Sequence, residues 1–546
     1  MKISIQWDTG KKLEYTLEHK LNIIDIPVEK GTEKVTVSGA LHVADIHSLW
    51  YDKSLAGPSQ NMEWNAQFTS AQHANTPYMA FFNRSSILRA AFALNDLIDD
   101  ARFSAKLNQQ NCTYDIKIEV SISPESGTFQ LYADLRRDIS FFDSLAEWRD
   151  WVNIPRPRFP AAAWEPVFCT WYAVHAEVTR QWVEKIVPQI LDLGFKTLII
   201  DDGWNYDDFK RVTPETLVDW YDKAGDWEIS PAKFPDFKNH VKKMQSLGIK
   251  YLVWVAPHMI GTNSRFYAEN RHAVLLQIHE GCGHLDVSCT DAVDALCRKV
   301  AGFAKENGLD GLKIDFLDIV PPDLDNPCGR NTLRMVKNLT GQLRADNPDA
   351  LIEFRQGYAT MAMLPYATQF RAGDVPFDWM LNFNRIMNIR LTLGDDIPVH
   401  ADPAYWADNE EAKNVSRHMI AMLPSVPMLS VDPETLSARD RKIVAYWIKF
   451  YQENRNLLNH GHWQMLFGYR EVDVAFVDSD TERLAIVSNH GRVAEIADIG
   501  SRQLKVLNIS DYIISLPGAE TFAPDGTEST AGEIPPGGWG VCSRII

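Results

Sequence analysis

The sequence predicts an α/β fold: a (β/α)8 barrel, or TIM barrel, flanked by an N-terminal antiparallel β-sandwich and a small C-terminal antiparallel β domain. Three observations predict it. The length of 546 residues suits two to four domains. In the middle of the chain, eight short apolar runs alternate with longer helical patterns, as a parallel barrel requires. On either side, apolar and polar residues alternate with the period of antiparallel strands. We expect four segments: a β-sandwich at 1–145, a linker at 146–164, the barrel at 165–457 and a β domain at 458–546.

The two β regions are predicted from period-two stretches that Gly, Asn, Pro and Ser turns separate. The clearest N-terminal stretches are "KVTVSGALHVADIH", "CTYDIKIEVSIS" and "GTFQLYADLRR". A short amphipathic helix and a proline-rich crossing, "SLAEWRDWVNIPRPRFPAAAW", lead from there to the barrel. Beyond residue 458, the C-terminal strands are predicted from "RLAIVSNHG", "RQLKVLNIS", "DYIISL" and "GGWGVCSRII".

The barrel strands are predicted from eight apolar runs. They are "PVFCTWY", "KTLIIDDGW", "IKYLVWVAPH", "DGLKIDF", "ALIEFRQG", "TQFRAGD", "IPVHAD" and "VPMLSVD". Helical patterns such as "EVTRQWVEKIVPQILDLG" and "DAVDALCRKVAGFAKENG" lie between several of them and end at Gly, as a helix C-terminus does. A doubly wound sheet is the alternative fold. It would usually carry a Gly-rich phosphate turn after its first strand, and this sequence has none.

Composition excludes several classes of partner. The net charge of −17 argues against nucleic acid and anionic membranes, because both need a clustered cationic surface. The seven cysteines form no CxxC pair, so we expect neither a disulfide framework nor a thiolate zinc site. No signal-peptide core and no run of about 18 apolar residues is visible. We therefore expect a cytoplasmic protein, although a chain whose signal peptide had been removed would look the same.

The apolar runs end in polar side chains. In a barrel these ends form the active-site rim. One Asp at a strand end is ordinarily a turn or helix cap, but eight polar endings on one rim are harder to explain as caps. The endings are Trp171-Tyr172, Asp201-Asp202-Gly203-Trp204, His258, Lys313 with Asp315, Arg355-Gln356, Arg371 with Asp374, His400 with Asp402, and Asp432.

Lys313 and Asp315 are the first catalytic candidates. Residues two apart in a strand share a face, so both side chains should point into the barrel mouth. An ammonium within about 4–6 Å keeps a carboxylate ionised by lowering its pKa. An ionised, immobile carboxylate in a partly dry pocket suits a nucleophile toward C1 of a sugar. The alternative is a structural ion pair, and buried pairs seldom improve stability.

A second carboxyl group is needed to protonate the leaving oxygen. The segment "RAGDVPFDW" offers Asp374 and Asp378. Asp374 directly follows a strand-like run, whereas Asp378 lies further into the loop, where a cap is expected. We therefore take Asp374 as the acid. Carboxylates about 5–5.5 Å apart would give retention of configuration, and about 6.5–9.5 Å would give inversion.

Asp201 and Asp202 are the expected acceptors for sugar hydroxyl groups. They are neighbours at a strand end, where both side chains can tilt toward a ligand. Trp204 is expected to supply an apolar stacking face beside them. A simple turn at this position is the alternative reading.

At these residues the barrel resembles the glycoside hydrolase clan that holds families 27, 31 and 36, the α-galactosidases and their α-glucosidase relatives. The resemblance spans residues 165–455. It rests on "LGFKTLIIDDGW", "GDWEISPAKFPDFKNHVKKMQSLGIKYLVWVAPHMIG", "HLDVSCTDAVDAL", "GLDGLKIDFLD" and "FRQGYATMAMLPYATQFRAGD", in this order. The "DDGW", "GDW" and "VHAD" stretches favour the melibiase-like family 36 and galactose.

The resemblance implies a retaining exo-α-glycosidase. It matches Asp315 to the family nucleophile and Asp374 to the acid/base. Further residues match substrate-binding positions of the clan: Asp201, Asp202, Lys313, Trp171, Trp254, Arg355, Arg371 and His400. No metal and no organic cofactor is implied, and the partner is a small oligosaccharide or other α-glycoside. Whether the chain forms a homo-oligomer is left open.

Two motifs depart from family 36. Where that family usually carries "KWDMNR" and "SDNTD", this chain has "KIDFLD" and "RAGDVPFDW", and the second is closer to family 31. An α-glucosidase-like or α-xylosidase-like activity is therefore an alternative, as is a transglycosylase resembling raffinose synthases. A non-catalytic sugar-binding protein would not need Asp315 and Asp374 together. A metal-dependent hydrolase is a further alternative, but His258, His284 and His400 are not spaced as a ligand pair.

Overall fold

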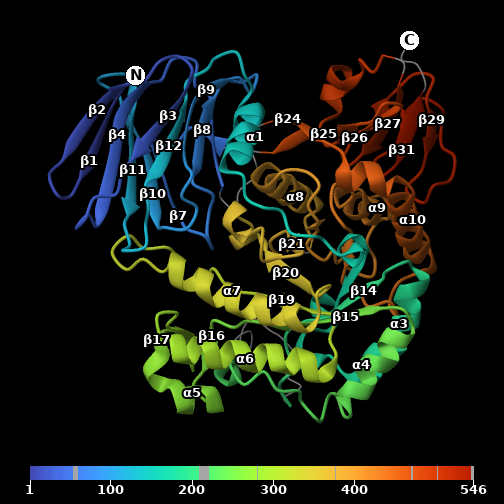
Figure 1. Ribbon diagram of the computed structural model, residues 1–546. Helices are drawn as coiled ribbons and strands as arrows, with labels where there is room; N and C mark the ends of the chain where they lie inside the picture. The colour runs from blue at the N-terminus through green and yellow to red at the C-terminus, as the bar shows by residue number, and fades with distance from the viewer. Residues whose placement is uncertain are drawn as a thin grey trace.

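A computed structural model describes residues 1–52, 60–207, 221–279, 281–375, 377–468, 471–500 and 502–542. The predicted fold class is confirmed. Figure 1 shows the N-terminal strands in blue, the barrel strands in the middle and the C-terminal sheet in red. The barrel therefore lies between two β regions.

The N-terminal region is a sandwich of two six-stranded antiparallel sheets. One has the order β2 (Lys12–Thr16), β1 (Lys2–Trp7), β4 (Lys34–His42), β11 (Thr113–Ser121), β10 (Ala101–Asn108) and β7 (Asn65–Ser70). The other has the order β3 (Leu21–Ile26), β12 (Phe129–Asp134), β9 (Leu88–Leu94), β8 (Tyr78–Phe82), β5 (Ser48–Tyr51) and β6 (Gln60–Asn61). In β1, Ile3, Ile5 and Trp7 are buried between the sheets, as the period-two pattern predicts.

Eight parallel strands form the barrel. In spatial order they are β22 (Val399–His400), β21 (Gln369–Arg371), β20 (Leu351–Arg355), β19 (Gly311–Ile314), β15 (Lys250–Val255), β14 (Thr197–Ile200), β13 (Val167–Cys169) and β23 (Met428–Leu429). Each lies within one of the predicted apolar runs. Bridges from His400 to Val426 and from Ala404 to Leu429 join the two ends of the sheet and close the ring.

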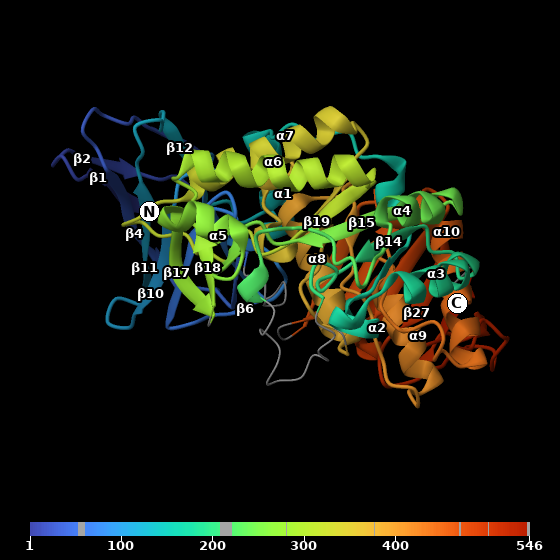
Figure 2. The same ribbon diagram turned by 90° about the horizontal axis from the view of Figure 1, so that it is seen from below.

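Ten α-helices are present in the described part of the chain. They are α1 (Phe141–Val152), α2 (Trp171–Val174), α3 (Arg180–Asp192), α4 (Phe237–Ser246), α5 (Arg265–Asn270), α6 (Thr290–Asn307), α7 (Gly329–Asp346), α8 (Trp379–Leu393), α9 (Ala412–Ala421) and α10 (Ala438–His460). Figure 2 shows α6 and α7 side by side along the outside of the barrel. The helix α6 ends at Gly308, which adopts the left-handed conformation with φ +66°. The predicted glycine stop is therefore correct.

An insertion after β15 was not predicted. It forms a three-stranded antiparallel sheet of β16 (Met259–Gly261), β18 (Cys282–Leu285) and β17 (Val274–His279). The C-terminal sheet has the order β24 (Trp463–Phe467), β25 (Val472–Asp478), β26 (Glu482–Val487), β27 (Gln503–Asn508), β31 (Trp539–Cys542) and β29 (Glu520–Phe522). It is antiparallel except for the pair β26 and β27. A two-stranded sheet of β28 (Ile514–Ser515) and β30 (Glu533–Ile534) lies beside it.

The N-terminal sandwich is anchored to the barrel near its mouth. The buried indole of Trp50 donates to Asn388 in α8 at 3.2 Å. Thr360, just beyond β20, donates to the carbonyl of Gln72 at 2.6 Å. His73 lies 2.8 Å from the carbonyl of Val320, which follows β19. These contacts hold the sandwich against the loops that form the active-site rim.

Candidate active site

Charged strand-end residues predicted from the sequence form one connected cluster at the mouth of the barrel: Asp201, Lys313, Asp315, Arg355, Arg371 and Asp374. Lys313 lies in β19 with Asp315 just beyond it, and Asp201 follows β14. Lys313 Nζ donates to Asp201 Oδ2 at 2.6 Å and lies 3.8 Å from Asp315 Oδ2. The prediction that Lys313 and Asp315 share a face is therefore confirmed, but the closer partner of the lysine is Asp201.

Asp315 is buried and is surrounded by donors. Trp254 Nε1 donates to its Oδ2 at 3.1 Å, and the backbone N–H of Phe316 donates to its Oδ1 at 3.0 Å. Arg355 lies 3.4 Å from the same Oδ1. Burial raises the pKa of Asp315, but Arg355 and Lys313 outweigh burial and hold the pKa well below its usual range. Asp315 is therefore a fixed, ionised carboxylate.

Asp374 lies in the loop after β21 and its side chain is 51% exposed. Arg371 Nη1 donates to its Oδ1 at 3.0 Å, and Arg355 Nη2 donates to its Oδ2 at 3.2 Å. Desolvation raises the pKa of Asp374, but Arg371 and Arg355 together hold it below its usual value. The nearby charge of Asp315 acts in the opposite direction and raises the pKa of Asp374. The charge on Asp315 therefore sets how readily Asp374 takes up a proton.

One guanidinium joins the two carboxylates across the mouth. Arg355 contacts Asp315 through one terminal nitrogen and Asp374 through the other. The guanidinium is a rigid planar fork, so one side chain holds both carboxylates at once. Asp315 and Asp374 therefore lie on either side of one guanidinium.

The two acids of the "DDGW" stretch are both buried. Asp201 Oδ2 accepts from Cys169 Sγ at 3.1 Å, and its Oδ1 accepts the backbone N–H of Asp202 at 2.9 Å. Thr170 Oγ1 accepts the N–H of Asp201 at 2.9 Å. Neighbours in the loop therefore fix Asp201 rigidly beside Lys313.

The aromatic candidates differ in their positions. Trp254 is buried and contacts Asp315, and half-buried Trp171 begins α2 directly after β13. Trp204 does not supply the expected stacking face. It is fully buried, its indole donates to the carbonyl of Trp254 at 2.8 Å, and its ring stacks on Phe303 of α6 at 4.8 Å. Trp204 thus packs behind the strands, and its assignment as a sugar contact is wrong.

His400 is also not placed to contact a ligand. It is fully buried inside the barrel. One ring nitrogen lies 3.0 Å from Glu353 Oε2 and the other lies 2.8 Å from the carbonyl of Ala163. Since both nitrogens are occupied by protein groups, His400 is a structural residue in this fold.

Asp402 is a site residue that the sequence reasoning named only as a strand ending. It is fully buried, and Arg371 Nη1 donates to its Oδ1. Its Oδ2 accepts the backbone N–H of Val375 at 2.6 Å and lies 3.4 Å from the hydroxyl of Tyr172. Burial raises the pKa of Asp402 to about 7. Asp402 thus holds both the residue after Asp374 and the arginine that contacts Asp374.

Tyr221 and Trp227 were also missed. Both are buried, and they follow the segment 208–220, which lies outside the described residues. Trp227 packs edge-on against Trp254 with 5.8 Å between ring centroids. Burial, together with the charges of Asp202 and Asp315, raises the pKa of Tyr221 well above its usual value. The only sequence signal was the "GDW" triplet, which was used for the family and not for these residues.

Comparison with known proteins finds relatives among the alpha-galactosidases. A family model described as Melibiase matches residues 149–322. Alpha-galactosidase AgaA of Geobacillus stearothermophilus is 22% identical over 377 residues, which cover 63% of this chain and 49% of the relative. Alpha-galactosidase 2 of Pediococcus pentosaceus is 30% identical over 157 residues, which cover 28% of this chain and 21% of the relative. The chain therefore matches about half or less of the length of these curated relatives.

Solved structures show the same architecture. The alpha-galactosidase from Lactobacillus brevis superposes with a TM-score of 0.65 at 13% identity, covering 100% of this chain and 88% of that one. A variant of AgaA in complex with raffinose superposes with a TM-score of 0.65 at 13% identity, covering 99% and 89%. In sequence, the middle of the chain is thus similar to Melibiase and to the alpha-galactosidases, and the whole chain has the fold of these solved structures. The clan resemblance predicted from the sequence is confirmed.

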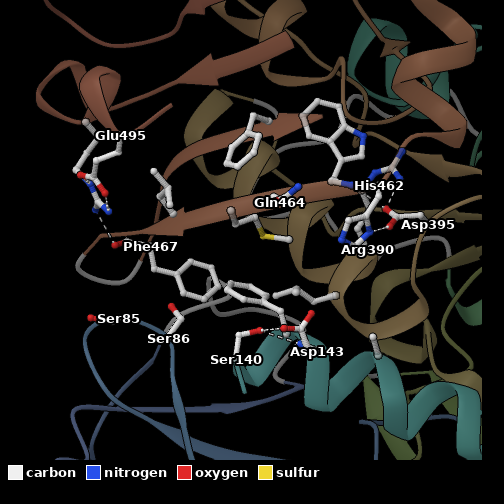
Figure 3. A pocket seen from close by; sticks show the side chains of 18 of the residues that line it. Ser85, Ser86, Ser140, Asp143, Arg390, Asp395, His462, Gln464, Phe467 and Glu495 are labelled. Atoms are coloured by element: carbon white, nitrogen blue, oxygen red, sulfur yellow. Dashed lines mark hydrogen bonds and ion pairs between the residues drawn. The ribbon is translucent and has the colours of Figure 1, made fainter. Parts of the chain in front are cut away.

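A cavity lies away from these site residues (Figure 3). It measures about 520 Å³ and lies between α1, the end of α8 and strand β24. Its polar lining includes Arg390, Asp395 and His462, with His462 Nδ1 2.6 Å from Asp395 Oδ2. The predicted site residues do not line it, so it is distinct from the barrel mouth.

Two features are absent from the part of the chain that the structure describes: a metal-type cluster of side chains and a membrane-spanning helix. No three His, Cys, Asp or Glu side chains converge there as they would around a metal ion. None of the helices in that part of the chain is long and apolar enough to cross a membrane.

Proposed function

We propose that this protein is a retaining exo-α-glycosidase that hydrolyses terminal α-linked galactosides. The observation that carries the proposal is the bridge of Arg355 between Asp315 and Asp374. It joins a carboxylate whose pKa is held low to a second carboxyl group whose pKa the charge on the first raises. Two carboxyl groups in these roles are what glycoside hydrolysis needs.

In the first step Asp315 attacks C1 of the sugar, and the bond from C1 to the glycosidic oxygen breaks. Asp374 donates its proton to that oxygen, and the leaving group departs as an alcohol. Two effects favour the proton on Asp374 at this stage: the charge on Asp315, and the exclusion of water by the bound sugar. The product is a β-linked glycosyl ester on Asp315.

In the second step Asp374 removes a proton from water, and the water oxygen attacks C1. The ester bond breaks, Asp315 regains its charge and the sugar leaves with its α configuration. Once Asp315 is esterified it no longer repels the charge on Asp374, so the pKa of Asp374 falls. Its change of role from acid to base follows from the geometry.

The remaining site residues are proposed to bind the terminal sugar. Asp201 and Asp202 accept hydrogen bonds from sugar hydroxyl groups, and Lys313 holds Asp201 in place while donating to the same sugar. Trp171 and Trp254 form the walls. Arg355 and Arg371 position the reacting carboxylates. Galactose is favoured because the curated relatives that match this chain are named alpha-galactosidases.

The test is a panel of nitrophenyl α-glycosides: galactoside, glucoside, xyloside and N-acetylgalactosaminide. We expect the galactoside to be cleaved fastest, with the α-anomer as the first product seen by NMR. A β-anomer would contradict retention, and preference for the glucoside or xyloside would favour the family 31-like activity. Adding an acceptor sugar separates hydrolysis from transglycosylation. In the Asp374→Ala variant, added azide should restore turnover, and the product should be a glycosyl azide.

We further propose that the protein works in a reducing compartment, the cytoplasm. All seven cysteines lie in the described part of the chain, and none is paired with another. Whether it acts as a homo-oligomer is a question for light scattering of the purified protein.

A further inference from the structure

Three aromatic side chains form a ladder beside the acid carboxyl group. Phe377 is 64% exposed and lies three residues after Asp374. Its ring lies 5.2 Å from that of Tyr405, and Tyr405 stacks on Tyr172 with 6.2 Å between ring centroids. Tyr405 and Tyr172 are each half-buried. Phe377 and Tyr405 follow β21 and β22, and Tyr172 lies in α2 directly after β13, so the three rings lie along one side of the barrel mouth.

The base of this ladder is held rigidly. Ser430 Oγ accepts the backbone N–H of Tyr172 at 2.9 Å and itself donates to the carbonyl of Cys169 at 2.6 Å. The hydroxyl of Tyr172 donates to Asp402 Oδ2 at 3.4 Å. The ladder is thus tied to Asp402, the residue that also fixes the backbone after Asp374.

The position of the ladder relative to the two carboxyl groups identifies what it faces. In a retaining mechanism the nucleophile attacks one face of the terminal sugar, and the leaving group departs from the other face, next to the acid. Asp315 lies after β19, whereas Asp374 and the ladder lie on the β21, β22 and β13 side. The leaving group must therefore lie over the loops that carry Phe377 and Tyr405.

The exposure of Phe377 also points to a ligand. A large apolar side chain that is two thirds exposed gains nothing from the fold, and isolated cases are common on protein surfaces. Phe377 is not isolated, because its ring continues a row of aromatic contacts through Tyr405 to Tyr172, whose hydroxyl donates to Asp402. Contiguous exposed aromatic surface at the edge of a site is typical of a ligand-binding face.

We propose that Phe377 and Tyr405 form the binding site for the leaving group, and that they select substrates whose leaving group has a flat apolar face, such as a second sugar ring or an aryl group. This inference rests on the proposed function, since it assigns the leaving-group side of the same site. The aromatic rings contact the C–H face of the leaving group while Asp374 protonates its oxygen. They do not touch the terminal sugar.

The test compares Phe377→Ala with the wild-type protein on three glycosides of the sugar that the wild-type protein cleaves best. One has a sugar leaving group, as in raffinose, one has nitrophenol and one has methanol. We expect kcat/KM to fall roughly tenfold for the first two, mostly through KM, as the loss of one buried apolar contact implies. The methyl glycoside should change by less than about twofold, because methanol is too small to reach the ring. Phe377→Trp should keep kcat/KM near the wild-type value on all three substrates, since Trp retains the flat apolar face.

Trp64→Ala is the matched control. Trp64 is 67% exposed on the N-terminal sandwich, just before β7, so its removal should leave all three rates unchanged. An equal loss on all three substrates in Phe377→Ala would overturn the inference, because it would show that Phe377 only shapes the loop of Asp374. A wild-type protein that cleaves no α-glycoside would instead contradict the proposed function. The two failures are therefore distinguishable.

Discussion

Arg371 donates through one nitrogen, Nη1, to both Asp374 and Asp402, with 3.0 Å to Asp374 Oδ1. The arginine is buried. One positive charge is thus shared by an exposed carboxyl group at the reaction centre and a buried one behind it. Because Asp402 also accepts the N–H of Val375, it fixes the backbone next to Asp374. Asp402 is a positioning residue that acts through Arg371.

Asp402→Asn should weaken acid catalysis selectively. We expect kcat/KM to fall about 10- to 100-fold for substrates with sugar leaving groups, which need the proton, and less than about threefold for nitrophenyl glycosides. Above about pH 7, where Asp402 is ionised in the wild-type protein, the substitution removes that charge, so Arg371 serves Asp374 alone and lowers the pKa of Asp374 further. The acid then loses its proton at lower pH, so the alkaline limb of the rate profile moves to lower pH. Rates on a series of substrates with different leaving groups measure the first effect. The pH dependence of kcat/KM measures the second.

Asp52→Asn is the control for Asp402→Asn. Asp52 is a buried carboxyl group in the N-terminal sandwich, and burial raises its pKa to about 7, as for Asp402. Asp52 Oδ2 accepts hydrogen bonds from the backbone N–H and the hydroxyl of Thr76. Asp52 thus belongs to the sandwich rather than to the strand ends of the barrel. Its removal should not alter the leaving-group dependence. A uniform loss on all substrates in Asp402→Asn would show a purely structural role.

Arg355→Gln should shift the acidic limb of the rate profile to higher pH. Among the groups that lower the pKa of Asp315, Arg355 has the largest effect. Removing its charge raises that pKa, so the nucleophile becomes protonated, and inactive, at higher pH. Activity near pH 4 should therefore fall more steeply than activity near pH 7. An unchanged acidic limb would mean that the other groups around Asp315, namely Lys313, Arg371 and Trp254, are enough to keep it ionised.

Trp204→Ala should act on stability. The indole is fully buried, hydrogen-bonded to the carbonyl of Trp254 and stacked on Phe303. Truncation of such a side chain costs about 3–5 kcal/mol of unfolding free energy. Denaturant unfolding measures this, with the exposed Trp64→Ala expected within about 0.5 kcal/mol of wild type. A stable Trp204→Ala protein with only a raised KM would restore the sugar-stacking role.

His258→Leu should stabilise the protein at acidic pH. His258 is fully buried, and neither ring nitrogen has a hydrogen-bond partner in the described part of the chain. Burial lowers its pKa to about 3, below the unfolded value of about 6.5. The unfolded chain therefore binds more protons between these values, and the wild-type protein loses stability as pH falls through that window.

The His258→Leu protein lacks this proton uptake, so its advantage over wild type should grow by about 1.5 kcal/mol between pH 6.5 and pH 5. Urea unfolding at both pH values measures the difference. Asp52→Asn should show the opposite dependence. The pKa of Asp52 is raised in the folded state, so wild type loses stability relative to that variant as pH rises from about 4 to 7. If the difference in unfolding free energy between His258→Leu and wild type is the same at pH 6.5 and pH 5, the ring of His258 reaches water in the folded protein.

The barrel could be predicted because its strands are short apolar runs with polar ends. The insertion β16 to β18 could not, since "MIG" and "CGHL" are too short and too rich in Gly to show a strand period. Lys313 and Asp315 were placed correctly because they lie in or next to a regular strand, where residues two apart share a face. The arrangement around Asp315 follows directly from that rule.

The two wrong assignments, Trp204 and His400, concern residues at positions where a strand ends and a loop begins. Trp204 follows Gly203, which has φ +100°, and the turn directs the indole outward to α6. His400 lies at the end of the two-residue strand β22, and its neighbours Glu353 and Ala163 are distant in the chain. Asp402 was undervalued for the same reason, because its role depends on Arg371 in β21, Val375 in the loop after it and Tyr172 in α2, which are distant from it in the chain. Such contacts have no signature in a single sequence.

The central claim is that Asp315 forms a covalent bond to the sugar while Asp374 handles the proton. Mass spectrometry of Asp374→Ala after mixing with an activated nitrophenyl α-galactoside tests it most directly, because the slow second step lets the intermediate accumulate. We expect a protein heavier by one galactosyl group, and peptide analysis should place that group on Asp315. A folded, active protein that never acquires the added mass, or that carries it on another residue, would contradict it.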